Sequence, residues 1–228
     1  MLERAEGREL LDDPEAPPSR VGASLRNIAT ANTLFGGAAA VRWGLRRALA
    51  GVPAGATLTM LDVGTGMGDL PTRARAWASR LGVRLVPVGL DRHRAAARLA
   101  HGHGLTALVG DGAALPIRSR GVDVVLLSQV AHHFGPCAVV HLLRECDRVA
   151  RRAVIVADLR RSRAAAFGWT LAARVLRFDD DTLRDGLTSL ARGYTLGSFR
   201  SLLEQAGVTA SVIRRPGSRI VAVWNPSR

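Results

Sequence analysis

The sequence contains no lysine and few aromatic residues. All 32 basic residues are arginines, and with 19 acidic residues they give a net charge of +13. A strongly basic surface can attract nucleic acid. The arginines are spread along the chain, however, and aromatic residues make up only 4% of it, too few for base-stacking surfaces. We therefore do not expect nucleic acid to be the partner.

Cysteines and long apolar runs are also scarce. Cys137 and Cys146 are the only cysteines. They are too few for a disulfide framework and lack the spacing of a zinc motif, so we expect a reducing, cytoplasmic location. No apolar run approaches about 18 residues, and the polar N-terminus does not resemble a signal peptide, so no membrane span or leader is expected. The 228 residues are 47% hydrophobic, enough for one domain of roughly 200 residues with appendages.

One stretch dominates the pattern of the chain. Residues 58–63 form an apolar run interrupted by Asp62, glycines follow at every second position from residue 64 to residue 68, and residues 70–81 are amphipathic. This order predicts a strand, a tight glycine turn and a helix, as in nucleotide-binding α/β units. Glycine allows a sharp turn and a close approach of the backbone to a ligand.

Acidic residues end the next two predicted strands. Asp91 closes residues 83–91, roughly 20 residues beyond the glycine turn, where a carboxylate meets a ribose diol. Asp111 ends a third short strand, and residues 122–128 read as a buried fourth strand. Acidic groups at successive strand ends suit an adenosine group better than a phosphate.

These motifs resemble those of class I S-adenosylmethionine-dependent methyltransferases. Leu-Asp-Val-Gly-Thr-Gly-Met-Gly at residues 61–68 is similar to their E/D-x-G-x-G-x-G motif, and the likeness extends over about residues 58–160. It implies S-adenosylmethionine as cofactor and S-adenosylhomocysteine as product. An NAD enzyme is the poorer interpretation, because Asp62 would repel a pyrophosphate. The cofactor-binding residues implied by the resemblance are Asp62, Gly64, Thr65, Gly66, Gly68, Asp69, Asp91, Arg92, Asp111, Gly112, Ala113, Ser128 and Gln129.

The resemblance also implies a fold. We expect a Rossmann-like α/β sheet of seven strands in the order 3-2-1-4-5-7-6, with the last strand antiparallel. Further strands are predicted at residues 152–158, 208–213 and 218–224, and further helices at residues 24–32, 38–50, 92–101, 139–148 and 164–176. The predicted division is an N-terminal arm and helical lid over residues 1–56 and a methyltransferase domain over residues 57–228, with a cap inserted at residues 164–192.

Residues 1–18 read as a mobile or loosely docked arm. The two helices predicted after this arm allow two interpretations. Asn32-Thr-Leu-Phe-Gly-Gly, with Arg42-Trp43 and Arg46, is similar to the segment before the cofactor loop in ubiquinone/menaquinone-biosynthesis C-methyltransferases, the type 11 group. There it packs over the cofactor as part of a lid; alternatively, these helices only cover a sheet edge.

Two adjacent histidines follow the predicted fourth strand. His132 and His133 lie where strand ends line a ligand crevice, so we expect them to be the catalytic acid–base groups. Packing against the cofactor is the alternative role. No metal site is predicted, because no Asp, Glu or His triad recurs at helical spacing. The acidic run at residues 179–181 is not expected to bind a cation either, and is predicted to be the solvated start of a helix.

The function predicted is methyl transfer to a small acceptor. The segment at residues 158–162 and the region at residues 187–194 resemble bacterial methyltransferases of secondary metabolism. The resemblance favours an aromatic or polyketide-derived hydroxyl or activated carbon as acceptor, and a monomer or homodimer. Two alternatives stay open: a non-catalytic S-adenosylmethionine-binding regulator or partner subunit, and an RNA methyltransferase suggested by the charge.

Overall fold

The computed structural model describes residue 4 and residues 7–226. Residues 1–3 and 5–6 of the predicted arm, and residues 227–228 of the predicted domain, lie outside the described residues. None of the helices in the described part of the chain has the length and apolarity needed to cross a bilayer.

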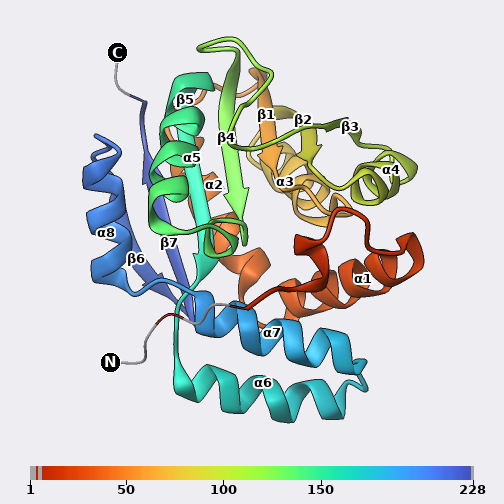
Figure 1. The fold of residues 1–228 in the computed structure, drawn as a ribbon. Helices are drawn as coiled ribbons and strands as arrows, with labels where there is room; N and C mark the ends of the chain where they lie inside the picture. The colour runs from red at the N-terminus through yellow and green to blue at the C-terminus, as the bar shows by residue number, and fades with distance from the viewer. Residues whose placement is uncertain (1–3, 5–6, 227–228) are drawn as a thin grey trace.

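A seven-stranded sheet forms the centre of the fold (Figure 1). Its strands are β1 (Thr57–Val63), β2 (Arg84–Asp91), β3 (Thr106–Val109), β4 (Val122–Ser128), β5 (Ala150–Leu159), β6 (Ser211–Arg215) and β7 (Arg219–Trp224). Their order in the sheet is β3-β2-β1-β4-β5-β7-β6. The first five strands are mutually parallel, and β7 runs antiparallel to both of its neighbours. The predicted fold class and strand order are therefore confirmed.

Helices cover the sheet and one of its ends. They are α1 (Pro18–Leu34), α2 (Gly37–Ala48), α3 (Asp69–Ser79), α4 (Arg94–Gly102), α5 (Pro136–Val149), α6 (Arg163–Val175), α7 (Asp180–Arg192) and α8 (Leu196–Gln205), with the short 3-10 turns η1 (Leu10–Asp12) and η2 (Ala131–His133). Every predicted helix is present, with ends that differ by a few residues. The largest difference is α1, which begins at Pro18 because proline is well tolerated in a first turn.

Two apolar cores hold the helices against the sheet. On one face, α5 packs on β4 and β5 and α8 packs on α5 and β6, burying side chains such as Leu142 and Phe199. On the other face, α2 packs on β5 and β7 and α3 packs on β2, burying Val41, Leu45 and Ala74. Because both faces are covered, the central strands read as nearly continuous apolar runs, as expected for parallel strands.

The position of the site follows from the strand order. The chain moves outward from β1 to β3 and then returns to β4, so the strand order reverses between β1 and β4. In open α/β sheets the ligand crevice lies at the carboxyl ends of the strands at such a point. Figure 1 shows α1, α6 and α7 lying across this end of the sheet, with α6 and α7 side by side.

The N-terminal arm is docked rather than loose, so this prediction was wrong for residues 7–18. Glu9 is buried, and η1 packs beside α1. The side chain of Arg192, at the end of α7, donates hydrogen bonds to Glu9 (3.3 Å) and Asp12 (2.6 Å). These partners are about 180 residues apart, so the local sequence carried no sign of them.

Candidate functional site

The glycine turn between β1 and α3 has the conformation that its sequence predicts. Gly64, Gly66 and Gly68 all have positive φ, at 72°, 56° and 81°. A Cβ atom on Gly64 would lie 2.3 Å from Cγ2 of Val130, so this position also needs glycine for space. The turn therefore lies directly against the segment that follows β4.

Asp91, at the end of β2, supports this turn. Its carboxylate accepts hydrogen bonds from the backbone N–H of Gly66 (2.9 Å) and of His93 (2.9 Å). Each oxygen keeps a lone pair for a further donor, as a ribose hydroxyl would supply. Burial raises the pKa of Asp91.

Two more carboxylates lie beside the turn. Asp62 accepts a hydrogen bond from the Thr65 hydroxyl (2.8 Å), and burial raises its pKa to about 8. Asp69, in the first turn of α3, accepts a hydrogen bond from Asn32 of α1 (3.2 Å), and burial raises its pKa. In the described part of the chain, Asp62, Asp69 and Asp91 form no ion pair with an arginine. The region around the turn therefore favours a cationic ligand.

A cavity of about 530 Å³ connects the turn with the histidines. The predicted site residues that line it are Asp62, Gly64, Thr65, Gly66, Asp69, Asp91, Arg92, Asp111, Gly112, Ser128, Gln129, His132 and His133. Gly68 and Ala113 do not line it. Gly68 instead caps α3, and the Ala113 backbone donates to Asp111 (2.9 Å).

The end of β4 adds polar groups to the cavity wall. The hydroxyl of Ser128 is buried and has no hydrogen-bond partner in the described part of the chain. Gln129 has a φ of 58° and is held by Asn32 of α1 and by Arg219 of β7, which donates to its side-chain oxygen (2.7 Å). The unpartnered hydroxyl points to a ligand as its missing partner.

Arg92 makes different contacts from those expected. Rather than lying free along the cavity, its guanidinium donates to the carbonyl oxygens of Leu11 (3.3 Å) and Asp12 (2.7 Å) in the N-terminal arm. It therefore ties the arm to the end of β2, while its role toward a cofactor stays a prediction.

His132 is fixed by a buried carboxylate at the end of β5. Its Nδ1 lies 2.6 Å from Oδ1 of Asp158, and Asp158 is fully buried. With Nδ1 donating to Asp158, the Nε2 atom carries the free lone pair. That Nε2 atom is buried and has no hydrogen-bond partner in the described chain.

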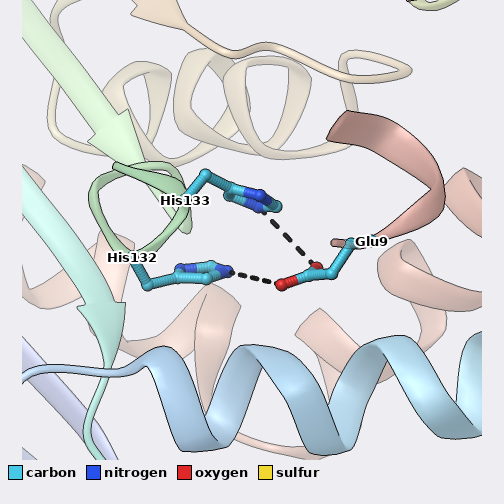
Figure 2. Close-up of side chains that lie close together, drawn as sticks. All are labelled: Glu9, His132 and His133. Atoms are coloured by element: carbon cyan, nitrogen blue, oxygen red, sulfur yellow. Dashed lines mark ion pairs between the residues drawn. The ribbon is translucent and has the colours of Figure 1, made fainter. Parts of the chain in front are cut away.

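His133 is held by the N-terminal arm. Its Nδ1 lies 2.8 Å from Oδ1 of Asp12, and the carboxylate of Glu9 faces both imidazoles (Figure 2). Burial raises the pKa of Glu9. Burial also opposes ionisation of Asp12, but its hydrogen bond with His133 lowers its pKa below the ordinary value.

The family comparison agrees with this geometry. Residues 61–157 match the family model described as "Methyltransferase domain". This segment is a methyltransferase domain. The resemblance to the type 11 group of class I S-adenosylmethionine-dependent methyltransferases is thereby confirmed, with S-adenosylmethionine as the cofactor. A search of curated proteins with the sequence found no match.

Solved structures show the same fold for the chain as a whole. An S-adenosylmethionine-dependent methyltransferase from Aquifex aeolicus is 17% identical, with 92% of this chain and 99% of that chain covered and a TM-score of 0.63. Magnesium protoporphyrin IX methyltransferase from Synechocystis PCC 6803, solved with S-adenosylmethionine, is 13% identical. The match covers 96% of this chain and 95% of that chain, with a TM-score of 0.60. A putative O-methyltransferase from Nostoc punctiforme PCC 73102 is 19% identical. The match covers 98% of this chain and 64% of that chain, with a TM-score of 0.62.

The residues around the glycine turn fit the cofactor. S-adenosylmethionine is cationic at its sulfonium and at its ammonium group, whereas a dinucleotide carries phosphates. Asp62, Asp69 and Asp91 are three carboxylates that form no ion pair with an arginine in the described chain, and the Gly64 turn leaves no room for a side chain. The electrostatics of the turn thus match a cation rather than a pyrophosphate.

Several residues of the candidate site were not identified from sequence. Glu9 and Asp12 come from the arm, Asp158 from the end of β5, and Arg192 from α7. Asp158 had a usable signal, because it ends a predicted strand adjacent to the fourth. Glu9 and Asp12 had none, since they belong to a polar segment without periodicity.

Proposed function

We propose that this methyltransferase transfers the methyl group of S-adenosylmethionine to a hydroxyl oxygen or an activated carbon of a small-molecule acceptor. The observation that carries the proposal is the single cavity shared by the glycine turn, Asp91 and the two histidines. A cofactor seated at the turn and an acceptor seated at the histidines would lie in one space. Such alignment can contribute up to roughly 7–11 kcal/mol to catalysis.

The glycine turn and its carboxylates would hold the cofactor. When bound, S-adenosylmethionine supplies an electrophilic methyl group on a sulfonium and leaves as S-adenosylhomocysteine. Asp91 would accept hydrogen bonds from the ribose hydroxyls, and Asp111, with Gly112 and Ala113, would border the adenine. The cofactor would approach the backbone of the turn closely at Gly64, Thr65, Gly66 and Gly68.

The amino acid part of the cofactor would lie toward α1 and β4. Asp62 and Asp69 would face its ammonium group, directly or through water, and Ser128 and Gln129 would supply polar contacts. The free hydroxyl of Ser128 supports this arrangement. Arg92 would border the adenosine from the arm side.

His132 would activate the acceptor. Its Nε2 lone pair would accept the proton of an acceptor hydroxyl, or of an oxygen that activates a carbon, as the new bond to the methyl carbon forms. Asp158 would orient the imidazole and stabilise the imidazolium that results. His133, held by Asp12, is the second candidate for this role.

The walls of the cavity support an aromatic or polyketide-derived acceptor, as in secondary metabolism. Phe35 and Trp169 both line it, and their rings pack edge to face with centroids 5.8 Å apart. Flat apolar molecules are favoured by such surfaces. The two free cysteines support the cytoplasmic location that we also propose, with a monomer or homodimer as the working form.

Calorimetry and product analysis test the proposal. Binding of S-adenosylmethionine and S-adenosylhomocysteine, but not NAD, is expected, followed by a mass gain of one methyl group in a phenolic or polyketide acceptor supplied with isotope-labelled cofactor. Binding of NAD instead would overturn the cofactor assignment. Methylation of bulk RNA but of no small acceptor would overturn the acceptor class.

A further inference from the structure

Three side chains from distant parts of the chain converge at one side of the cavity. Nε2 of His132 lies 4.0 Å from Oε1 of Glu9, and Nε2 of His133 lies 3.9 Å from Oε2 of the same carboxylate. Figure 2 shows both imidazoles directed toward Glu9. One nitrogen from each histidine and one oxygen of Glu9 all lie within 4.8 Å of one another.

Each histidine has its other nitrogen bound to a second carboxylate. Nδ1 of His132 lies 2.6 Å from Asp158, and Nδ1 of His133 lies 2.8 Å from Asp12. Metal-binding histidines almost always donate their second ring N–H in this way, which fixes the tautomer and directs the free lone pair to the ion. Both Nε2 atoms are thus prepared as ligands on the side that faces Glu9.

The protein does not satisfy the lone pair of His132 by itself. The His132 side chain is 2% exposed, yet its Nε2 atom has no hydrogen-bond partner in the described chain. Buried polar atoms in folded proteins almost always have a partner, so this one points to a missing ligand. We propose that Glu9, His132 and His133 form a binding site for a divalent transition-metal ion, with zinc as the probe of choice.

The donor set determines the class of ion. Two imidazole nitrogens and one carboxylate oxygen suit zinc and its first-row neighbours, whereas calcium and magnesium prefer oxygen alone. Three protein ligands leave one position of a tetrahedron open, as in catalytic zinc sites. Because all three residues line the cavity, that position can face it.

The charges around the histidines are mixed. The carboxylates of Glu9, Asp12 and Asp158 lie beside the imidazoles. Arg192 contacts Glu9 (3.3 Å) and Asp12 (2.6 Å), and Arg92 lies 3.7 Å from Asp12. These guanidinium groups balance the carboxylates, so what favours an ion is the arrangement of its three ligands and the unpartnered Nε2 atom of His132.

Binding requires small movements of all three side chains. Ligand atoms in a tetrahedral zinc site lie about 3.3–3.5 Å apart, from bonds of about 2.0–2.2 Å. The two Glu9 oxygens lie 4.0 Å and 3.9 Å from the nearer imidazole nitrogens, and the three ligand atoms lie within 4.8 Å of one another, so the ligands must draw together by about one ångström. Glu9 must also loosen its hydrogen bonds from Ser189 (2.7 Å) and Arg192 (3.3 Å). An ion held in this way occupies the Nε2 lone pair that the proposed base catalysis uses, so the ion-bound form and the form in which His132 accepts a proton are two alternative states of the site. The ion site is therefore a property separate from the proposed methyl transfer.

Metal titration of the full chain tests the site without any acceptor. After treatment with a chelator, the protein is titrated with Co²⁺, followed by visible absorption, and with Zn²⁺, followed by calorimetry. One ion per chain is expected, with an absorption intensity typical of four or five ligands. His133→Ala and Glu9→Gln should each weaken binding at least about tenfold, and Asp12→Asn about 10–100-fold, since it orients His133.

A surface histidine provides the matched control. His101, exposed at the end of α4 and outside the cavity, should bind no ion, so His101→Ala should leave the titration unchanged. Circular dichroism and S-adenosylmethionine affinity, measured on each variant, separate metal loss from misfolding and from failure of the proposed function. The proposal is overturned if no ion binds in a one-to-one ratio, or if His133→Ala and Glu9→Gln bind it as the wild type does.

Discussion

Replacing Asp62 by asparagine should change how the stability of the protein depends on pH. Burial raises the pKa of this carboxyl from 3.8 to about 8, and only the Thr65 hydroxyl donates a side-chain hydrogen bond to it. Asparagine keeps the shape and the acceptor oxygen but cannot ionise. The comparison of the two proteins therefore isolates the cost of the buried charge.

The sign and the size of the change in unfolding free energy follow from the linkage between proton binding and folding. Between about pH 4 and pH 8 the folded protein retains a proton on Asp62 that the unfolded chain has lost, so the free energy of unfolding falls as the pH rises. The stabilising effect of this proton is complete below the unfolded pKa and is lost as the pH passes the folded pKa. At about 1.4 kcal/mol per pKa unit, the loss between pH 6 and pH 8 is about 2 kcal/mol.

Urea unfolding at pH 6, 7 and 8, without cofactor, measures this effect. The difference in unfolding free energy between Asp62→Asn and wild type should shift by about 2 kcal/mol in favour of the variant from pH 6 to pH 8. Parallel profiles for the two proteins would refute the argument, because they would mean that Asp62 is already ionised in the fold. Excess S-adenosylmethionine should reduce the shift, since its positive charge favours the ionised carboxylate.

Three other substitutions test the site and its supports. Asp91→Ala should weaken S-adenosylmethionine binding by about 1–3 kcal/mol through lost charged hydrogen bonds, and unchanged affinity by calorimetry would move the ribose contact elsewhere. Gly64→Ala should lower the melting temperature more than Gly104→Ala, because both have positive φ but only the first places a Cβ against Val130. Equal decreases in melting temperature would mean that the structure relaxes around the new Cβ atom at residue 64 and removes the contact with Val130. Arg192→Leu should destabilise the protein by about 3–5 kcal/mol in urea, because it leaves the buried Glu9 without its ion-pair partner and removes the shorter of the two arginine contacts of Asp12. A loss below about 1 kcal/mol would show that the arm contributes little to stability.

The sequence by itself determined the sheet, the cofactor turn and the cofactor class. These features are encoded within short windows: an apolar strand, alternate glycines with positive φ, and a carboxylate at the end of the next strand. The places of Asp62, Asp91 and Asp111 in the cavity wall could be predicted because each lies in or at the end of an apolar run, next to the turn or loop that follows it. The capping of α7 by Asp179, which accepts a hydrogen bond from the Thr182 N–H (2.8 Å), was confirmed for the same reason.

Only the tertiary structure decided what surrounds the histidines. His132 and His133 were visible as a pair, but the carboxylate that faces them comes from Glu9, and Asp12 lies 121 positions from His133. No periodicity or propensity links such positions, because the contact exists only after α1, α7 and the arm close over the strand ends. Burial and long-range ion pairs then fix an arm that looks polar and mobile in sequence. The same closure leaves one imidazole nitrogen without a partner, which local sequence cannot show.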